Sequence, residues 1–526
     1  MKTLTENGIK VLERRYLQQD ETGRIIETPE GLFRRVARAI AQAELQWGGS
    51  READLWEARF FDLLSGLHFL PNSPTLMNAG LPAHQLSACF VLPVEDRLTE
   101  IFNSLKNAAL IHQSGGGTGF NFSHLRPMHD MVSSRSGTAS GPVSFMQLFD
   151  EATQHIKQGG KRRGANMGIL NAEHPDIFEF IKAKDDHQML RNFNISVGLH
   201  DAFMHALEKG GEWELIHPNS KKVVNRIPAK QLWDALLQSA WSTGDPGLIF
   251  LDTINQYNPT PALGPMEATN PCGEVPLYPY EACNLGSINL SNCVQAVDGK
   301  SAVHWELLGE RIDTAIRFLD NVIEVNQYLL PEIQEITKGN RKIGLGVMGW
   351  AELLIQLQLP YDSDAAVQLA GELMRFVQLR AFSASQELAK QRGVFPNWSQ
   401  SIYAPDQPVR HATRSSIAPT GTISIIAGCS SSIEPLFALA YRREHVLNDE
   451  SLLSVNPLFI EQLEKSGFHH DAIMQQVMES GMISQIAELP ETLKAVFKTA
   501  LEIAPEWHIQ HQIAFQRYTD NAVSKT

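Results

Sequence analysis

The hydrophobic residues near the start of the chain recur at the spacing of an α-helix. Leu32, Val36 and Ile40 lie four residues apart and would therefore share one face of a helix. Similar spacing continues up to the turn-rich stretch 71–74. These patterns predict an N-terminal helical region over residues 1–68.

Beyond that region, short apolar runs alternate with longer stretches of helical periodicity. The predicted strands cover residues 89–92, 193–197, 213–216, 248–251, 287–290 and 422–426. The predicted helices cover residues 94–108, 308–330 and 363–392. Strands that alternate with helices indicate an α/β fold with a largely parallel sheet. Because we find no internal repeat, low-complexity tract or linker, we predict that residues 69–526 form one large domain.

Composition excludes several classes of protein. The chain has 526 residues, of which 43% are hydrophobic and 20% charged, as in ordinary soluble globular proteins. It has no apolar run of the roughly 18–20 residues that a membrane helix needs, and no apolar signal segment at its start. The net charge of −14 argues against binding a nucleic acid backbone, which needs a basic face. We therefore predict neither a membrane nor a nucleic acid as partner.

Five cysteines occur, at positions 89, 272, 283, 293 and 429. An odd, small number without a Cys-x-x-Cys pair is typical of a reducing cytoplasm rather than of a disulfide framework or a zinc ribbon. A cytoplasmic location is therefore predicted.

The stretch Asn270-Pro271-Cys272-Gly273-Glu274 places an amide, a thiol and a carboxylate at alternate positions. If it is extended, these three side chains share one face, where a base and an orienting amide would flank a redox-capable sulfur. The alternative is an inert buried thiol, as most single cysteines are.

Two further stretches suit an anionic ligand. The turn 419–424, Pro-Thr-Gly-Thr-Ile-Ser, would expose backbone N–H groups to phosphate, and the glycines of 114–119 would let a ligand approach the backbone closely. An ordinary Ser/Thr-rich turn and a flexible loop are the alternatives. The clusters 161–163 and 341–342 are interpreted as solvated turns or local anion pockets.

Two other motifs are interpreted as structural. Residues 344–349 match the GxGxxG pattern, but the polar stretch 338–342 precedes them, so a tight helix-packing turn is favoured over a dinucleotide site. His508 and His511 are three residues apart without a nearby third ligand, so they are interpreted as ordinary helix positions, and no metal site is predicted.

Taken together, the motifs resemble the large catalytic subunit of ribonucleotide reductase, most closely its class II, adenosylcobalamin-dependent branch. The matching segments are 72–80 (NSPTLMNAG), 85–90 (QLSACF), 115–119, 158–162, 192–197, 270–274, 281–290, 342–350 and 419–424. The resemblance implies a ten-stranded α/β barrel of two five-stranded halves, with a finger loop that carries a cysteine into its centre. The chain ends at residues 520–526, where family members continue. The expectation is thus that the last strand and a cysteine-bearing tail are missing.

The resemblance also assigns roles to five residues. Cys272 would form the thiyl radical that removes the 3′-hydrogen of a ribonucleotide. Glu274 would take the proton of the 3′-hydroxyl, which Asn270 would hold by a hydrogen bond. Cys89 and Cys283 would be the dithiol that protonates the leaving 2′-hydroxyl, supplies two electrons and ends as a disulfide.

Binding sites follow from the same resemblance. The residues implied to bind substrate are Ser73, Ala88, Cys89, Gly117, Asn270, Pro271, Cys272, Gly273, Glu274, Pro419, Thr420, Gly421, Thr422, Ile423 and Ser424. Asp96 and Arg126, with the loops near 131–137 and 184–191, would bind a deoxynucleotide effector at the interface of a homodimer.

The implied cofactor is adenosylcobalamin, and a thioredoxin-like reductant is the implied partner. The cobalamin motif Asp-x-His-x-x-Gly fails at its nearest match, 185–190, which lacks the glycine. Two alternatives stay open: the same barrel served by a separate metal-radical subunit, or a non-catalytic half that needs a complementary C-terminal fragment. Whether the substrate is a di- or triphosphate is also open.

Overall fold

The structure is a computed structural model that describes residues 2–82, 84–131, 137–158, 162–186, 188–447, 450–468 and 471–526.

The first two helices of the N-terminal region begin at residues with short polar side chains. Its first helices are α1 (Glu6–Arg15), α2 (Pro29–Ala41) and α3 (Gly49–Ser65). The side chains of Thr5 and Thr28 accept hydrogen bonds from the first turns of α1 and α2. The predicted helical periodicity is thus confirmed, and the buried face of α2 packs on α11 (Trp305–Val325).

The central sheet consists of two parallel halves that meet in one antiparallel contact. Its strands are β1 (Phe69–Pro71), β2 (Cys89–Val91), β3 (Gly117–Asn121), β6 (Asn166–Asn171), β7 (Phe193–Leu199), β10 (Gly247–Phe250), β13 (Ala282–Asn289) and β16 (Ile343–Met348). Strands β2, β3, β6, β7 and β10 are parallel to one another, and β13 is parallel to β16. The halves join where β2 pairs antiparallel with β13, and the short strand β1 also pairs antiparallel with β13. The second half continues through bridges from Leu345 to Ser415 and from Ile417 to Val523.

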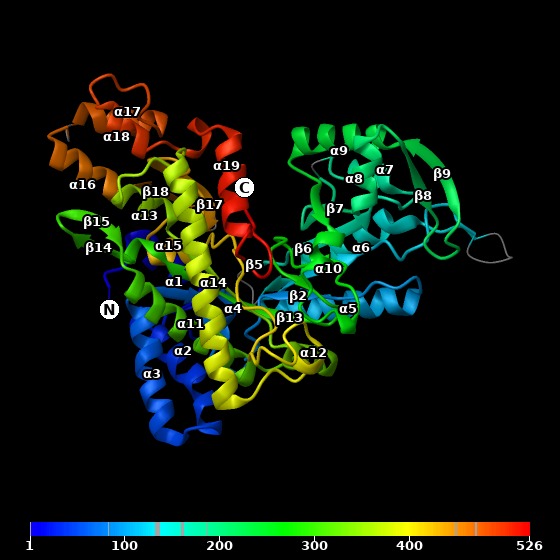
Figure 1. Cartoon of the computed structure of the whole chain (residues 1–526), viewed down its shortest axis with the longest axis horizontal. Helices are drawn as coiled ribbons and strands as arrows, with labels where there is room; N and C mark the ends of the chain where they lie inside the picture. The colour runs from blue at the N-terminus through cyan, green and yellow to red at the C-terminus, as the bar shows by residue number, and fades with distance from the viewer. Residues whose placement is uncertain are drawn as a thin grey trace.

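Helices cover the outside of this curved sheet. They include α5 (Leu98–Ser114), α6 (Gly141–His155), α9 (Ala229–Thr243), α14 (Asp364–Arg392) and α19 (Pro505–Gln516). Figure 1 shows α5, α6 and α9 with the first half, and α11, α14 and the N-terminal helices with the second. Among the described helices, none is both long and apolar enough to cross a membrane. The predicted α/β barrel class is confirmed.

Smaller elements lie at the periphery. Hairpins form from β8 (Glu212–Ile216) with β9 (Val223–Pro228), and from β14 (Val294–Val297) with β15 (Lys300–Val303). Helices α16 (Pro457–Ser466), α17 (Asp471–Ser480) and α18 (Glu491–Val496) gather at the top left of Figure 1. The strands predicted at 193–197, 213–216 and 248–251 correspond to β7, β8 and β10, and residues 287–289 end the longer strand β13.

Three predictions from the sequence are wrong. Residues 422–426 are not a strand, because Ile423–Ala427 forms the short helix α15; a short buried apolar run has no periodicity that separates helix from strand. Residues 344–349 are not a helix-packing turn, because 343–348 is the buried strand β16. Gly346 is required there, since a Cβ would lie 2.4 Å from the carbonyl oxygen of Ser416.

The third correction concerns Arg341 and Lys342, which form neither a solvated turn nor an anion pocket. Both are buried and paired with carboxylates: Arg341 with Asp320 and Glu324, and Lys342 with Glu281. The side chains of the other predicted cluster, 161–163, lie outside the described part of the chain.

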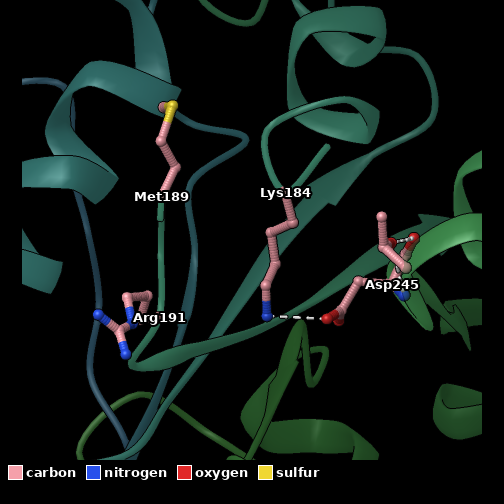
Figure 2. Close-up of a pocket in the computed structure, with 5 residues that line it drawn as sticks. Lys184, Met189, Arg191 and Asp245 are labelled. Carbon is pink, nitrogen blue, oxygen red and sulfur yellow. Dashed lines mark hydrogen bonds and ion pairs between the residues drawn. The ribbon is translucent and has the colours of Figure 1, made fainter. Parts of the chain in front are cut away.

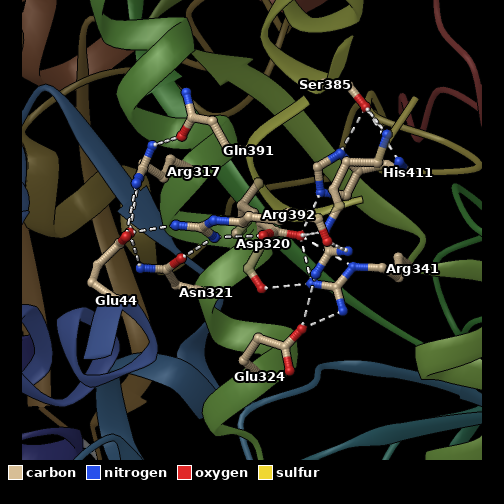
Figure 3. A network of polar contacts seen from close by, with 12 residues as sticks. Glu44, Arg317, Asp320, Asn321, Glu324, Arg341, Ser385, Gln391, Arg392 and His411 are labelled. Atoms are coloured by element: carbon tan, nitrogen blue, oxygen red, sulfur yellow. Dashed lines mark hydrogen bonds and ion pairs between the residues drawn. The ribbon is translucent and has the colours of Figure 1, made fainter. Parts of the chain in front are cut away.

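A buried network of charges joins the N-terminal region to the barrel (Figure 3). Asp320 of α11 pairs with Arg341, Arg392 and Arg410, and Arg392 also pairs with Glu44 of the N-terminal region. Despite complete burial, Arg341, the hydrogen bond from His411 and Arg410 hold the pKa of Asp320 well below its usual range. The carboxylate is therefore ionised and links three segments that are distant in sequence.

Substitution of Asp320 by Asn is expected to lower the free energy of unfolding by about 3–5 kcal/mol, because it leaves buried guanidinium groups without their shared carboxylate. Asp313→Asn on the same helix is the matched control, since its ion pair with Arg380 is about half exposed and is worth about 0–1 kcal/mol. Urea unfolding of both variants measures the difference. Equal midpoints would contradict a stabilising role for the network.

Candidate active site

The central cysteine lies on a tight loop between two very short strands. Strand β11 (Ala268–Thr269) pairs with β12 (Pro276–Leu277), and the loop 270–275 connects them. Gly273 has φ +83°, which only glycine adopts readily, and its N–H donates to the carbonyl oxygen of Asn270 at 3.1 Å. The loop is thus a turn rather than an extended segment. It still brings Asn270 and Glu274 together, with Asn270 Nδ2 2.8 Å from Glu274 Oε2.

Close backbone contacts hold this loop inside the barrel. A Cβ on Gly119 of β3 would lie 1.7 Å from the carbonyl oxygen of Thr269, so only glycine permits the observed approach. Asn194 Nδ2 of β7 donates to the carbonyl oxygen of Pro271 at 2.8 Å. On the other side, Ser416 Oγ donates to the carbonyl oxygen of Glu274 at 2.9 Å. Both halves of the barrel therefore anchor the loop.

The other two candidate cysteines face each other across the antiparallel contact of the halves. Cys89 of β2 and Cys283 of β13 are direct register partners, and both are buried. Opposite residues on paired strands present their side chains on the same face, at Cα separations of about 4.5–5.5 Å. This range is within what a disulfide requires. Asn270 Nδ2 also lies 3.3 Å from Cys89 Sγ, which connects the loop to this pair.

Burial controls the ionisation of these groups. Desolvation raises the pKa of Glu274 to about 7, although the hydrogen bond from Asn270 opposes the shift. Desolvation also raises the pKa of both Cys89 and Cys283, with a further contribution from Glu274 to Cys89 and from Glu281 to Cys283. The two thiols are thus protonated at neutral pH and able to donate protons, while Glu274 is poised between acid and base.

A cavity of about 220 Å³ collects most of the candidate residues. Its lining includes Ser73, Ala88, Cys89, Gly117, Asn270, Pro271, Cys272, Glu274, Pro419, Thr420, Gly421, Thr422 and Ile423. Three of the predicted catalytic and substrate-binding residues do not line it. Cys283 is the register partner of Cys89, Gly273 forms the turn of the loop, and the Ser424 hydroxyl bonds to that of Ser431. The thiol-bearing Cys272 is exposed, in contrast to Cys89 and Cys283.

Sequence reasoning missed several lining residues. They are Asn72, Pro74, Ala165, Leu285, Gly286, Ser287 and Ala418, whereas Gly115 belongs to the glycine stretch 114–119 that was predicted to admit a ligand. Asn72, Pro74 and Ala418 directly adjoin predicted residues, and 285–287 follow Cys283 on β13, so proximity along the chain could have indicated them. Asn72 also has a structural task, because its side chain bonds to the backbone of Leu86 and Leu285.

The turn 419–424 is shaped by its own side chains. Thr420 has φ +54°, and its Oγ1 accepts a hydrogen bond from the N–H of Ser432 at 2.7 Å. Gly421 is exposed, and a Cβ there would meet nothing within 4 Å. The turn therefore leaves an open, backbone-lined edge to the cavity, as a bound phosphate would need.

The predicted effector residues fall at two places. Asp96 and Arg126 form an ion pair at 2.8 Å near the carboxyl ends of β2 and β3. Lys184 and Asp245 pair at 2.8 Å near the amino ends of β7 and β10, beside a hollow that Met189 and Arg191 also line (Figure 2). Within a single chain, these two places therefore lie at opposite ends of the parallel strands. Residues 132–136 of the loop near 131–137 lie outside the described residues, as does His187.

The histidines interpreted as ordinary helix positions have backbone partners. His508 Nε2 contacts the carbonyl oxygen of Ala500 at 3.3 Å, and His511 Nε2 contacts that of Tyr361 at 2.9 Å. Across the described ranges, no group of three or more His, Cys, Asp or Glu side chains is arranged to hold a metal ion.

The fold and site define an α/β-barrel protein with a cysteine-bearing loop and a facing pair of cysteines at its centre. Residues 2–84 match the family description "Ribonucleotide reductase, all-alpha domain", and residues 87–408 and 404–526 match "Ribonucleotide reductase, barrel domain". The chain therefore belongs to the ribonucleotide reductase family, and it is an enzyme that reduces ribonucleotides to 2′-deoxyribonucleotides.

Several relatives cover nearly the whole chain. It is 49% identical to the vitamin B12-dependent ribonucleoside-diphosphate reductase of Thermoplasma acidophilum, over 99% of this chain and 75% of that protein. It is 50% identical to the protein of the same name from Mycobacterium tuberculosis strain H37Rv, over 99% and 73%. Among solved structures, the class Id ribonucleotide reductase alpha subunit of Actinobacillus ureae matches with a TM-score of 0.79 and 25% identity, over 99% of this chain and 90% of that one.

Substitution of Gly119 by Ala is expected to displace the cysteine loop, because the new methyl group and the carbonyl of Thr269 cannot both keep their places. A misplacement of about 1 Å lowers turnover by about 100-fold. The steady-state rate of ribonucleotide reduction measures the effect. Gly371→Ala in helix α14 is the control, since its Cβ has room, and its rate is expected to equal that of the unaltered protein. Full activity of Gly119→Ala would contradict the close approach.

Proposed function

We propose that this chain reduces ribonucleoside diphosphates by a thiyl-radical reaction that depends on adenosylcobalamin. One observation carries the proposal: Cys272, Asn270, Glu274 and Cys89 line one cavity, and Cys283 is the register partner of Cys89. The diphosphate and the cofactor are supported by the names of the relatives that are 49–50% identical.

Each residue has one task in the proposed reaction. A radical on Cys272 removes the 3′-hydrogen of the ribose, and Glu274 accepts the proton of the 3′-hydroxyl group. The 2′-hydroxyl leaves as water after it takes a proton from the Cys89–Cys283 pair. The dithiol supplies two electrons and becomes a disulfide, and Cys272 returns a hydrogen atom to C3′. The sum is ribonucleotide plus dithiol to deoxyribonucleotide, disulfide and water.

Exposure of Cys272 supports the fit of a large cofactor. Cys272, Gly421 and Ala165 are the exposed residues of the cavity lining, whereas Asn270 and Glu274 are buried. A bulky group can therefore face the Cys272 sulfur from outside while a nucleotide occupies the cavity. When bound, adenosylcobalamin supplies the radical that oxidises the Cys272 thiol.

A second candidate keeps the barrel and takes its radical from a separate subunit. The similarity to the class Id alpha subunit of Actinobacillus ureae favours this alternative. The chain is 25% identical to that alpha subunit, which is about half its identity to the vitamin B12-dependent relatives. The cobalamin-dependent reaction is therefore preferred.

A homodimer is part of the proposal. On α5, Leu98 and Phe102 are 65% and 52% exposed, and Leu148 of α6 is also exposed. Burial of such apolar side chains between two copies is favourable. Within a single chain, the Asp96–Arg126 pair and the loop near 184–191 lie at opposite ends of the parallel strands. A deoxynucleotide site made from both places therefore needs a second subunit.

Access to the dithiol limits the choice of reductant. Cys89 and Cys283 are 3% and 0% exposed. A folded thioredoxin-like protein cannot reach them directly, so a small dithiol or a cysteine-bearing segment must enter the cavity.

Replacement of Cys272 by Ser is expected to abolish formation of deoxynucleotides, because a hydroxyl group cannot carry the radical. Nucleotide binding is expected to persist, since the turn 419–424 is unchanged. The assay supplies a ribonucleoside diphosphate, adenosylcobalamin and dithiothreitol, and chromatography detects the product. Cys429→Ser is the matched control and is expected to remain active. Turnover by Cys272→Ser would refute the radical assignment. Turnover of the unaltered protein that requires an added metal-radical subunit would favour the second candidate.

The pH dependence of kcat/KM is expected to report Glu274. A carboxyl group whose pKa is raised to about 7 is protonated below that pH and cannot accept the 3′-hydroxyl proton. The rate is therefore expected to fall by about tenfold per pH unit below 7 and to level off above it. Glu274→Gln is expected to be slow at every pH and to lose this inflection. An unchanged acid limb in that variant would assign the titration to another group.

A further inference from the structure

Lys342 is a buried cation that the proposed reaction does not use. It directly precedes β16, beside Cys283, since the next residues along the two strands, Ile343 and Asn284, are register partners. Its side chain is 1% exposed and that of its partner Glu281 is 0% exposed. The ammonium nitrogen lies 2.8 Å from Glu281 Oε2.

Both oxygens of the Glu281 carboxylate accept hydrogen bonds from neighbouring groups. Oε1 accepts a hydrogen bond from Asn340 Nδ2 at 2.7 Å, and Oε2 accepts one from the backbone N–H of Tyr278 at 3.0 Å. Burial of a charge pair has a large desolvation cost, and apolar side chains of similar size often give equal or greater stability. Stability alone is therefore a weak explanation for this pair.

The remaining contacts of Lys342 point to the cysteine loop. Its Nζ lies 3.2 Å from Met266 Sδ, just before β11, and 3.5 Å from the carbonyl oxygen of Pro276 in β12. It also lies over the ring of Tyr278, 4.8 Å from the centroid. One ammonium group thus contacts both stems of the hairpin that carries Cys272.

The backbone of the same residue contacts the dithiol. The Cys283 thiol lies within hydrogen-bond distance of two carbonyl oxygens, that of Lys342 at 3.5 Å and that of Asn284 at 3.4 Å. The preceding residue, Arg341, has φ +50° and is held by Asp320 and Glu324 in the network of Figure 3. The backbone of Lys342 is therefore held by the Arg341 ion pairs and by strand β16, and not by the loop that its side chain contacts.

We propose that Lys342 is a positioning residue that sets the separation between the Cys272 loop and the Cys89–Cys283 pair. Its ammonium group holds the two stems of the loop, and its carbonyl group holds Cys283. The inference rests on the proposed function, because the radical sulfur and the dithiol must act on the two faces of one ribose.

The test uses the double variant Lys342→Met/Glu281→Gln, since Lys342→Met alone leaves a buried carboxylate unpaired and can fail to fold. We expect the double variant to keep its unfolding midpoint while kcat for ribonucleotide reduction falls by about 100-fold, as a small misplacement of reacting groups produces. KM is expected to change little, because the turn 419–424 is untouched. Lys498→Met/Asp362→Asn removes another Lys–carboxylate pair and is expected to keep the full kcat.

A second measurement needs neither turnover nor cofactor. In a Cys429→Ser background, a nitroxide label attached to the exposed Cys272 reports the mobility of the loop by electron paramagnetic resonance. We expect a more mobile spectrum in Lys342→Met/Glu281→Gln and an unchanged spectrum in the control pair. An unchanged spectrum in the double variant overturns the proposal, whether or not kcat falls. If the unaltered protein reduces no nucleotide, the proposed function fails, while the spectra still decide the role of Lys342.

Discussion

The antiparallel contact between β2 and β13 is the constraint on which the site depends. Apart from the short strand β1, which pairs antiparallel with β13, the strands within each barrel half are parallel, and parallel neighbours are separated by a helical crossover. At this one junction, Cys89 and Cys283 become direct neighbours although they are far apart in sequence. Without that register, the two buried thiols would not share a face, as the proposed dithiol requires.

The barrel then supplies a dry interior into which a loop can enter. Gly117 and Gly119 remove the side chains that would block the hairpin, and hydrogen bonds from both halves fix its backbone. The same exclusion of water has an electrostatic consequence. It keeps the thiols protonated, as proton donors need to be, but it also raises the pKa of Glu274 to about 7. The burial that would shelter the proposed radical from water therefore also lowers the ionised fraction of Glu274. The hydrogen bond from Asn270 to the carboxylate partly opposes this effect.

The sequence predicted the alternating fold and the candidate residues of the cavity better than it predicted their local geometry. Amphipathic spacing located α5, α11 and α14 because each has one clearly buried face. It failed for α15 and β16, whose short apolar runs are buried on all sides and have no distinguishing period. The spacing of Asn270, Cys272 and Glu274 suggested one face of an extended strand, whereas a turn at Gly273 brings the amide and the carboxylate together. Arg341 and Lys342 look like a solvated pair, since their carboxylate partners come from distant segments that only the fold brings near.

The N-terminal helices also contribute to the site. Tyr16, which directly follows α1, is buried, and its hydroxyl group lies 2.7 Å from Ser73 Oγ, an atom of a cavity-lining residue. Helix α1 packs on α15, where a Cβ at Gly8 would come within 3.3 Å of the carbonyl oxygens of Ile425 and Ile426. Since α15 directly follows the turn 419–422, the helical region supports the open edge of the cavity from behind. Together with the Glu44–Arg392 pair, these contacts make the helical region a structural wall of the active site rather than an appendage to the barrel.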